Sequence, residues 1–298
     1  MKIYGAGLAG LLAACAWQRA EVWEANPRPR YTGHRALLRF RSPAVGDAVG
    51  IQFRKVHVHK EIWGEFGPAR PTIALANAYS MKVIGRLADR SIWSLDPVDR
   101  WVAPADFIEQ LIDRVGDRIH WGKAVTARDL KRPGPAISTL PMPTLVGMLR
   151  LGAIEKFTAS SRDITVERWR VPGADVYQTI YFPSQETTLY RASITGDLLT
   201  AEYVGQPDDA WFLEAFGLVR SDVEFIDVAP QKNGKLAEID DQWRKQFIFW
   251  LTQTYGIYSL GRFGTWRNIL LDDVLKDIDV IKKLDAGSAY DHAKALAG

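Results

Sequence analysis

Apolar runs with short polar breaks fill the first 24 positions of the chain. Residues 2–4 and 21–24 have the apolar, β-favouring character of short strands, and residues 8–19 between them predict a buried helix. A turn rich in glycine separates the first strand from the helix. Strand, turn, helix and strand in this order predict the opening βαβ unit of a doubly wound parallel sheet.

The strand-to-helix turn carries the pattern G-x-G-x-x-G. In such a turn the first glycine permits the bend, the second lets a pyrophosphate approach the main chain, and the third lets the helix pack on the strand. An acidic residue ends the second strand, 19 residues after the first glycine, where a carboxylate accepts hydrogen bonds from ribose hydroxyls. The candidate dinucleotide-binding residues are Gly5, Gly7, Leu8, Ala9, Gly10 and Glu24.

The alternative is a glycine-rich turn with an incidental glutamate, and the ordered succession of elements favours the nucleotide site. A fingerprint at the start of the chain is typical of proteins that bind the ADP half of FAD there, whereas NAD(P) domains often follow other elements. Residues 26–35 form a basic loop, because their prolines and glycine exclude a helix. Arg35 in this loop is either a partner of the pyrophosphate or a solvated arginine.

Further along, the pattern changes from helical to alternating and back. Residues 101–114 predict an amphipathic helix, and residues 53–63 a second helix. Strands are expected at 118–121, 136–141, 176–182, 188–194, 198–204 and 257–260, and a short segment to Val125 follows the first of them. Further helices are expected at 240–255 and from about 271.

These elements predict an α/β (α+β) protein of two joined domains. A Rossmann-type FAD-binding domain with a parallel sheet is expected from residues 1–50, 100–142 and 255–298. A second, antiparallel-sheet substrate domain is expected from residues 51–99 and 143–254.

Composition narrows the class further. The 298 residues are 47% hydrophobic, with no apolar run long enough to span a membrane, and the first strand leaves no room for a signal peptide, so a cytoplasmic protein is expected. A single cysteine, Cys15, excludes an internal disulfide and a cysteine-built metal site. The net charge of +3 fits an anionic substrate or nucleic acid without the charge pattern of a dedicated DNA-binding protein.

Three segments together resemble the glutathione-reductase-like FAD family, which includes UDP-galactopyranose mutases, protoporphyrinogen oxidases and amine oxidases. They are residues 5–10 with Glu24, the segment Ile-Ser-Thr-Leu-Pro at 137–141, and the segment Gly-Arg-Phe-Gly-Thr-Trp at 261–266. The resemblance implies FAD as the cofactor. It adds to the cofactor-binding candidates Val125, Thr139, Leu140, Pro141, Gly261, Arg262 and Trp266.

The resemblance covers about 110 residues at the chain ends and one central strand. In length the chain is similar to compact phage and bacterial FAD oxidoreductases, some of which resemble amine oxidases and act on glycyl-modified thymine. This likeness implies a small-molecule or modified-nucleotide substrate, with DNA as a further candidate. Mutases are usually longer and carry a histidine-containing glycine loop, of which residues 33–35 are a partial match.

A flavin enzyme has its reactive centre in the cofactor, so the protein has chiefly to hold the substrate's charged groups. An amino-acid-like amine needs an arginine or lysine for its carboxylate and aromatic walls for its reacting carbon. The substrate-binding candidates are Arg54, His57, Tyr181 and Arg191. Arg191 could equally form a cross-strand charge pair, and His57 with His59 lacks a third ligand, so no metal is expected.

Three functions follow, in order. The first is an FAD amine oxidoreductase that oxidises a C–N bond, the second a non-redox FAD isomerase of the mutase kind, and the third a flavin-binding scaffold without turnover. If DNA is the substrate, the basic residues Arg54, Lys55 and Lys60 are expected to line a groove and binding to fall steeply with salt.

Overall fold

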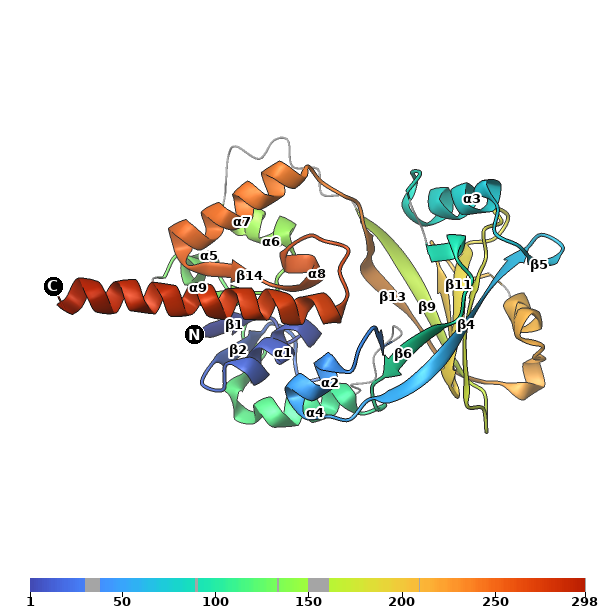
Figure 1. The fold of residues 1–298 in the computed structure, drawn as a ribbon, viewed down its shortest axis with the longest axis horizontal. Coiled ribbons are helices and arrows are strands. Elements are labelled where there is room, and N and C mark those ends of the chain that lie inside the picture. Colours follow the sequence, from blue (N-terminus) through green and yellow to red (C-terminus); the bar gives the residue numbers. More distant parts are fainter. Residues whose placement is uncertain (30–37, 89–90, 133, 150–160, 209, 298) are drawn as a thin grey trace.

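The computed structural model describes residues 1–29, 38–88, 91–132, 134–149, 161–208 and 210–297. Arg35 lies outside these described residues. Two sheets organise the molecule (Figure 1). Helices surround a small parallel sheet in one lobe, a long curled sheet fills the other, and strands β9 and β13 run from one lobe toward the other.

The parallel sheet has the order β14-β8-β1-β2-β7, and each of its pairs is parallel. Its strands come from segments far apart in the chain, which confirms the predicted doubly wound sheet. The bounds are β1 Lys2–Tyr4, β2 Glu21–Glu24, β7 Ile119–Trp121, β8 Ala136–Ser138 and β14 Ile257–Ser259. The division of the chain into two domains at the expected residue numbers stays a prediction.

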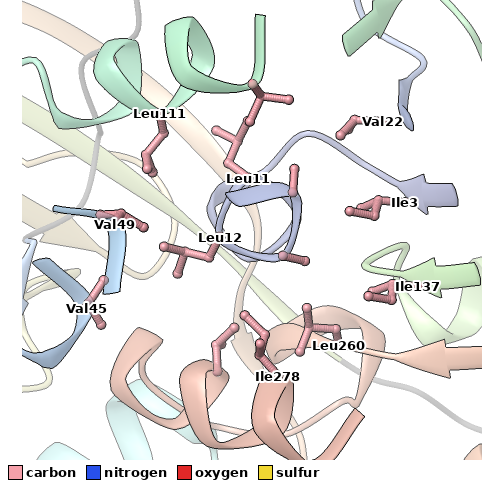
Figure 2. Close-up of a cluster of buried hydrophobic side chains, with 14 of the residues drawn as sticks. Ile3, Leu11, Leu12, Val22, Val45, Val49, Leu111, Ile137, Leu260 and Ile278 are labelled. Carbon is pink, nitrogen blue, oxygen red and sulfur yellow. The ribbon is translucent and has the colours of Figure 1, made fainter. Parts of the chain in front are cut away.

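Helix α1 (Leu8–Ala16) is the centre of this lobe's core. Figure 2 shows Leu11 and Leu12 on α1 surrounded by apolar side chains from the strands and from three helices, and each of these two leucines is at most 2% exposed. The surrounding helices are α2 (Ala44–Val49), α4 (Phe107–Val115) and α9 (Leu271–Ala297). This packing fixes the start of α1, and with it the glycine turn, against the sheet.

The second sheet is mixed and has the order β13-β9-β12-β11-β10-β4-β6-β3, with β5 paired to β4. Most of its pairs are antiparallel, as expected, but β4 and β10 run parallel. The bounds are β3 Arg39–Phe40, β4 Arg54–Gly64, β5 Gly67–Ala69, β6 Val98–Val102, β9 Ser161–Arg170, β10 Val176–Tyr181, β11 Leu189–Gly196, β12 Leu198–Tyr203 and β13 Glu224–Leu236.

Two apolar clusters cover this sheet. In one, α3 (Ile73–Ile84) places Tyr79 with its ring centroid 5.4 Å from that of Tyr181. In the other, the 3₁₀ segment Ala210–Phe216 packs Phe212 beside Trp169. The central strands of the sheet are therefore buried between these clusters, whereas alternate residues of β4 and β13 are exposed.

The helix predicted at residues 53–63 is wrong, because the segment is strand β4. Val56 and Val58 are buried while the residues between and beside them are exposed, which is the two-residue period of a strand. Similarly, residues 98–102 form a strand, and the amphipathic helix begins only at Phe107. The charged residues in these segments hid the alternation.

The remaining helices lie around the parallel sheet: α5 (Ala127–Leu130), α6 (Met142–Leu149), α7 (Asp241–Tyr255) and α8 (Gly261–Gly264). Helix α7 begins at Asp240, whose carboxylate accepts a hydrogen bond from the main-chain N–H of Trp243, as expected of an N-cap. None of the described helices has both the length and the apolarity required to cross a bilayer.

Candidate functional site

The turn between β1 and α1 has the geometry that its glycines predict. Gly5 has φ of +99°, which favours glycine, and a Cβ on Gly10 would lie 2.0 Å from the carbonyl oxygen of Gly5. A Cβ on Gly7, by contrast, would have no protein atom within 4 Å. Two glycines are therefore required by close packing, and the third leaves open space beside the main chain.

Glu24 lies at the end of β2 and holds this turn. Its carboxylate accepts hydrogen bonds from the main-chain N–H of Ala6 at 2.8 Å and from the main-chain and side-chain nitrogens of Asn26 at 2.9 and 2.7 Å. The residue predicted to bind ribose thus also ties the glycine turn to the next strand. Its carboxylate lies beside the start of α1, where the two roles are compatible.

The C-terminal motif closes against the same turn. Gly261 has φ of +79°, and a Cβ there would lie 2.7 Å from the Cβ of Ala9. A Cβ on Gly264 would lie 2.7 Å from the carbonyl oxygen of Ser138 at the end of β8. The two glycine motifs and the central strand of the predicted site are therefore in direct contact.

A cavity of about 480 Å³ opens where these segments meet the second sheet. Its lining combines the glycine turn, the C-terminal motif and residues of β3 and β13. The predicted residues that line it are Gly7, Leu8, Ala9, Thr139, Gly261 and Arg262, and those the sequence did not single out include Arg39, Phe40, Gln231, Phe263 and Asp272.

Arg262 lines this cavity with part of its hydrogen-bonding capacity unused. Its Nη2 donates to the carbonyl oxygen of Gly234 at 2.9 Å, while its buried Nε has no partner. Burial lowers the pKa of the Arg262 guanidinium from its ordinary value. Asp272, also in the lining, has one buried oxygen, Oδ2, without a hydrogen-bond partner. The Nε–H of Arg262 is suited to donate to a polar ligand group, and the Oδ2 of Asp272 to accept from one.

The remaining cofactor candidates include Thr139, which lines the cavity, and residues outside its lining. The hydroxyl of Thr139 donates to the carbonyl oxygen of Tyr4 at 2.9 Å, which fixes the end of β8 beside the end of β1. Trp266 is buried and its indole N–H donates to the carbonyl oxygen of Ala237. Residues that support the site from outside its lining are Gly5, Gly10, Glu24, Val125, Leu140, Pro141 and Trp266.

Two of the substrate-binding candidates, Arg54 and His57, lie on β4 with exposed side chains and do not line the cavity. Arg54 pairs with Asp175 at 2.6 Å, and the side chains of both are 60% exposed. His57 lies 3.1 Å from Asp99, which also pairs with Lys55 at 2.6 Å. Neighbouring carboxylates thus offset the basic segment, and the structure does not bring these residues to the cavity.

Tyr181 and Arg191 are cross-strand partners on β10 and β11. The fork of Arg191 is engaged by Glu202, with Nη2 2.8 Å from Oε1 and Nε bonded to Oε2. Burial opposes the charge, but the Glu202 carboxylate raises the pKa of Arg191 well above its ordinary value. Of the two readings of Arg191 left open by the sequence, the geometry is that of the cross-strand charge pair.

Comparison with known proteins identifies the fold. No protein-family model matches the chain, and no curated protein matches its sequence. Among solved structures, a reduced UDP-galactopyranose mutase is similar over 89% of this chain and 90% of its own, with a TM-score of 0.62 at 14% identity.

Two further structures agree. The PF1083 protein from Pyrococcus furiosus is similar over 95% of this chain and 96% of its own, with a TM-score of 0.57 at 12% identity. The tryptophan 5-halogenase MibH is similar over 95% of this chain and 65% of its own, with a TM-score of 0.50 at 13% identity. The chain therefore has the two-sheet, Rossmann-type fold that these proteins share.

Proposed function

We propose that the protein is an FAD-dependent oxidoreductase that oxidises a C–N bond of an amino-acid-like amine. The observation that carries the cofactor is the contact between two glycine motifs around a cavity with an open face at Gly7. The shared fold with enzymes such as the mutase and the halogenase supports a catalytic role over a scaffold.

The residues present fit FAD. The N–H groups at the start of α1 and the Arg262 guanidinium offer donors to a diphosphate. The Oδ2 of Asp272, which accepts no hydrogen bond and lies 4.0 Å from Nε of Arg41, is suited to a ligand hydroxyl. Glu24 lies beside the turn where a ribose would follow the diphosphate. These groups come from both ends of the chain, so the cavity forms only when the whole lobe is folded.

When bound, FAD supplies a hydride acceptor for the carbon next to nitrogen. The chain's own residues bind the substrate and exclude water while this carbon loses a hydride and the nitrogen loses its proton, leaving an imine. Water then adds to the imine and releases a free amine and an oxo-acid. The apolar cavity residues Phe40 and Phe263 offer aromatic walls for the reacting end of the substrate.

For the substrate itself, a glycyl-modified thymine is the finer form of the proposal, since its glycyl part is an amine with a carboxylate. The names of the similar structures give this form no support. The pairing of Arg54 and Lys55 with carboxylates also weakens the case for a DNA groove on β4. A free small molecule is therefore the preferred substrate class.

A non-redox isomerase of the mutase kind is the second candidate, because the mutase structure is similar over nearly the whole of both chains. Anaerobic addition of N-benzylglycine to the FAD-loaded protein separates the two. Bleaching of the flavin's visible band supports the oxidoreductase. Conversion of UDP-galactopyranose only after reduction with dithionite supports the isomerase. A folded preparation that stays colourless and takes up no FAD on incubation contradicts both.

A further inference from the structure

Arg39 is a cation of the cavity lining that the residues around it do not neutralise. It lies on β3 and reaches the paired strands β10 and β11. Its Nε donates to the Thr195 hydroxyl at 2.9 Å and its Nη1 to the Thr179 hydroxyl at 2.8 Å. Its Nη2 donates to the carbonyl oxygens of Gln178, at 3.2 Å, and of Ile194.

Every one of these four acceptors is uncharged. Two other arginines of the same sheet, one buried and one half-buried, have carboxylate partners: Arg168 pairs with Asp227 at 2.7 Å, and Arg191 pairs with Glu202. Within the described residues no carboxylate forms an ion pair with Arg39. A half-buried cation without a counter-charge lowers the stability of the fold, and a ligand that supplies a negative charge would offset this cost.

The surroundings of Arg39 strengthen this imbalance. Burial and, after it, the positive charge of Arg191 lower the pKa of Arg39 to about 10, so the guanidinium is still charged at neutral pH. Arg100 adds a further positive charge in its vicinity. A negative ligand group bound here would relieve the repulsion among these side chains.

The position of Arg39 in the cavity indicates whether the negative group it binds belongs to the cofactor or to the substrate. The diphosphate is assigned to the glycine turn at the start of α1. Arg39 and Gln231 line the cavity from strands β3 and β13 of the second sheet. In a cavity shared by a cofactor and its substrate, this leaves the side of the second sheet to the substrate.

We propose that Arg39 is the residue that selects substrates carrying a carboxylate. The proposal rests on the function proposed above and replaces Arg191, whose charge the Glu202 carboxylate already neutralises, as the group that holds the substrate's acid. Because the guanidinium is already fixed by two threonines and two carbonyl oxygens, a carboxylate would bind to a positioned cation with little loss of side-chain freedom.

The test compares two ligands that differ in charge and little in shape. Phenylacetate and phenylacetamide are titrated into the FAD-loaded protein, with dissociation constants taken from the shift of the flavin's visible band and from tryptophan fluorescence. The same titrations are done on Arg39→Met and on the control Arg170→Met, which removes an exposed arginine of the same sheet that lies 3.6 Å from Asp197.

Wild-type protein and Arg170→Met are expected to bind phenylacetate at least about 10-fold more tightly than phenylacetamide. Arg39→Met is expected to lose about 10–100-fold in phenylacetate affinity and to keep its affinity for phenylacetamide, since a hydrogen bond to a charged group is the stronger kind. If Arg39→Met does not fold, Arg39→Gln keeps amide donors for the threonines and should show the same loss.

Equal binding of the two ligands by wild-type protein overturns the proposal, as does an unchanged preference in either variant. The FAD content of each preparation is measured separately. A protein that takes up FAD but shows no carboxylate preference contradicts only the role of Arg39, whereas a protein that takes up no FAD contradicts the proposed function itself.

Discussion

The two walls of the cavity are built by different means. On the side of the parallel sheet, main-chain geometry does the work: Gly5, Gly10 and Gly261 let segments approach to distances at which any side chain would collide. On the side of the mixed sheet, charged side chains matter: Arg39 lines the cavity, and the pair of Arg191 with Glu202 lies in the same sheet outside the lining. The first wall depends on glycines that have no Cβ atom. The second depends on how far each arginine is neutralised by a carboxylate.

This difference predicts where each wall is vulnerable. On the glycine side, an added methyl group should collide with its immediate neighbours and lower the free energy of unfolding. On the charged side, removing one partner of an ion pair should lower the free energy of unfolding, because the other charge is left without its partner inside the fold. Changes of each kind therefore test whether the comparison holds.

The largest effect is expected in the mixed sheet from Glu202→Leu. The Glu202 side chain is 5% exposed, and its loss leaves the Arg191 guanidinium without a counter-charge, so the free energy of unfolding should fall by about 3–5 kcal/mol. Urea unfolding measures it. The double variant Arg191→Met with Glu202→Leu should recover most of the loss, and equal losses in the single and double variants would show that packing rather than charge matters there.

In the parallel-sheet wall, Gly10→Ala should have the next largest effect. The added Cβ would lie 2.0 Å from the carbonyl oxygen of Gly5, a main-chain atom that cannot move aside cheaply, so a loss of about 1–3 kcal/mol is expected. Urea unfolding and FAD content of the purified variant check it. Unchanged stability would mean that the turn relaxes, and that close packing does not define this wall.

The same contrast explains what the sequence could predict. The βαβ unit, its glycine turn and Glu24 follow one another within 24 residues, so local patterns carry both the elements and their geometry. Strands β10 to β12 and helix α7 were likewise predicted correctly, because each has a clear period and short turns. The meeting of the two chain ends followed from the resemblance of their motifs.

The charged wall could not be predicted, because it depends on pairing between distant segments. Strand β4 lies parallel to β10, more than a hundred residues away, and no local signal gives that register. Arg39 gains its role only from hydrogen bonds to residues near positions 178 and 194. The sequence shows Arg39 only as an arginine next to an apolar residue, and this description also fits Arg54, an exposed arginine on β4.

A smaller effect is expected from pH, through Lys82 in the mixed-sheet lobe. This lysine is 7% exposed and donates to the carbonyl oxygens of Phe182 and Leu189, and burial lowers its pKa to about 8. The unfolded chain then binds more protons than the folded one between about pH 8 and 10.5. Stability should therefore rise with pH across this window, by up to about 3 kcal/mol.

Urea unfolding at several pH values between these limits measures the rise. In Lys82→Met this part of the pH dependence should vanish, whatever the absolute stability of the variant. A wild-type stability that stays level or falls over the window would show that the lysine charge is accommodated in the fold, and the mixed sheet would then be less dependent on charge balance than the comparison requires.

The smallest effect on stability and the sharpest on function are expected from Gly7→Ala. The added methyl group meets no protein atom within 4 Å, so the free energy of unfolding should change by less than about 0.5 kcal/mol. The methyl group nevertheless occupies the open face beside the main chain where the diphosphate is assigned, so FAD affinity should fall by at least about 10-fold.

The matched control is Gly147→Ala at an exposed position of α6, where the added methyl group also meets no atom within 4 Å; this variant should keep wild-type affinity. Fluorescence titration of FAD into the three apoproteins gives the affinities. If Gly7→Ala binds FAD like the control, the space beside the glycine turn is no ligand site, and close packing alone accounts for that wall.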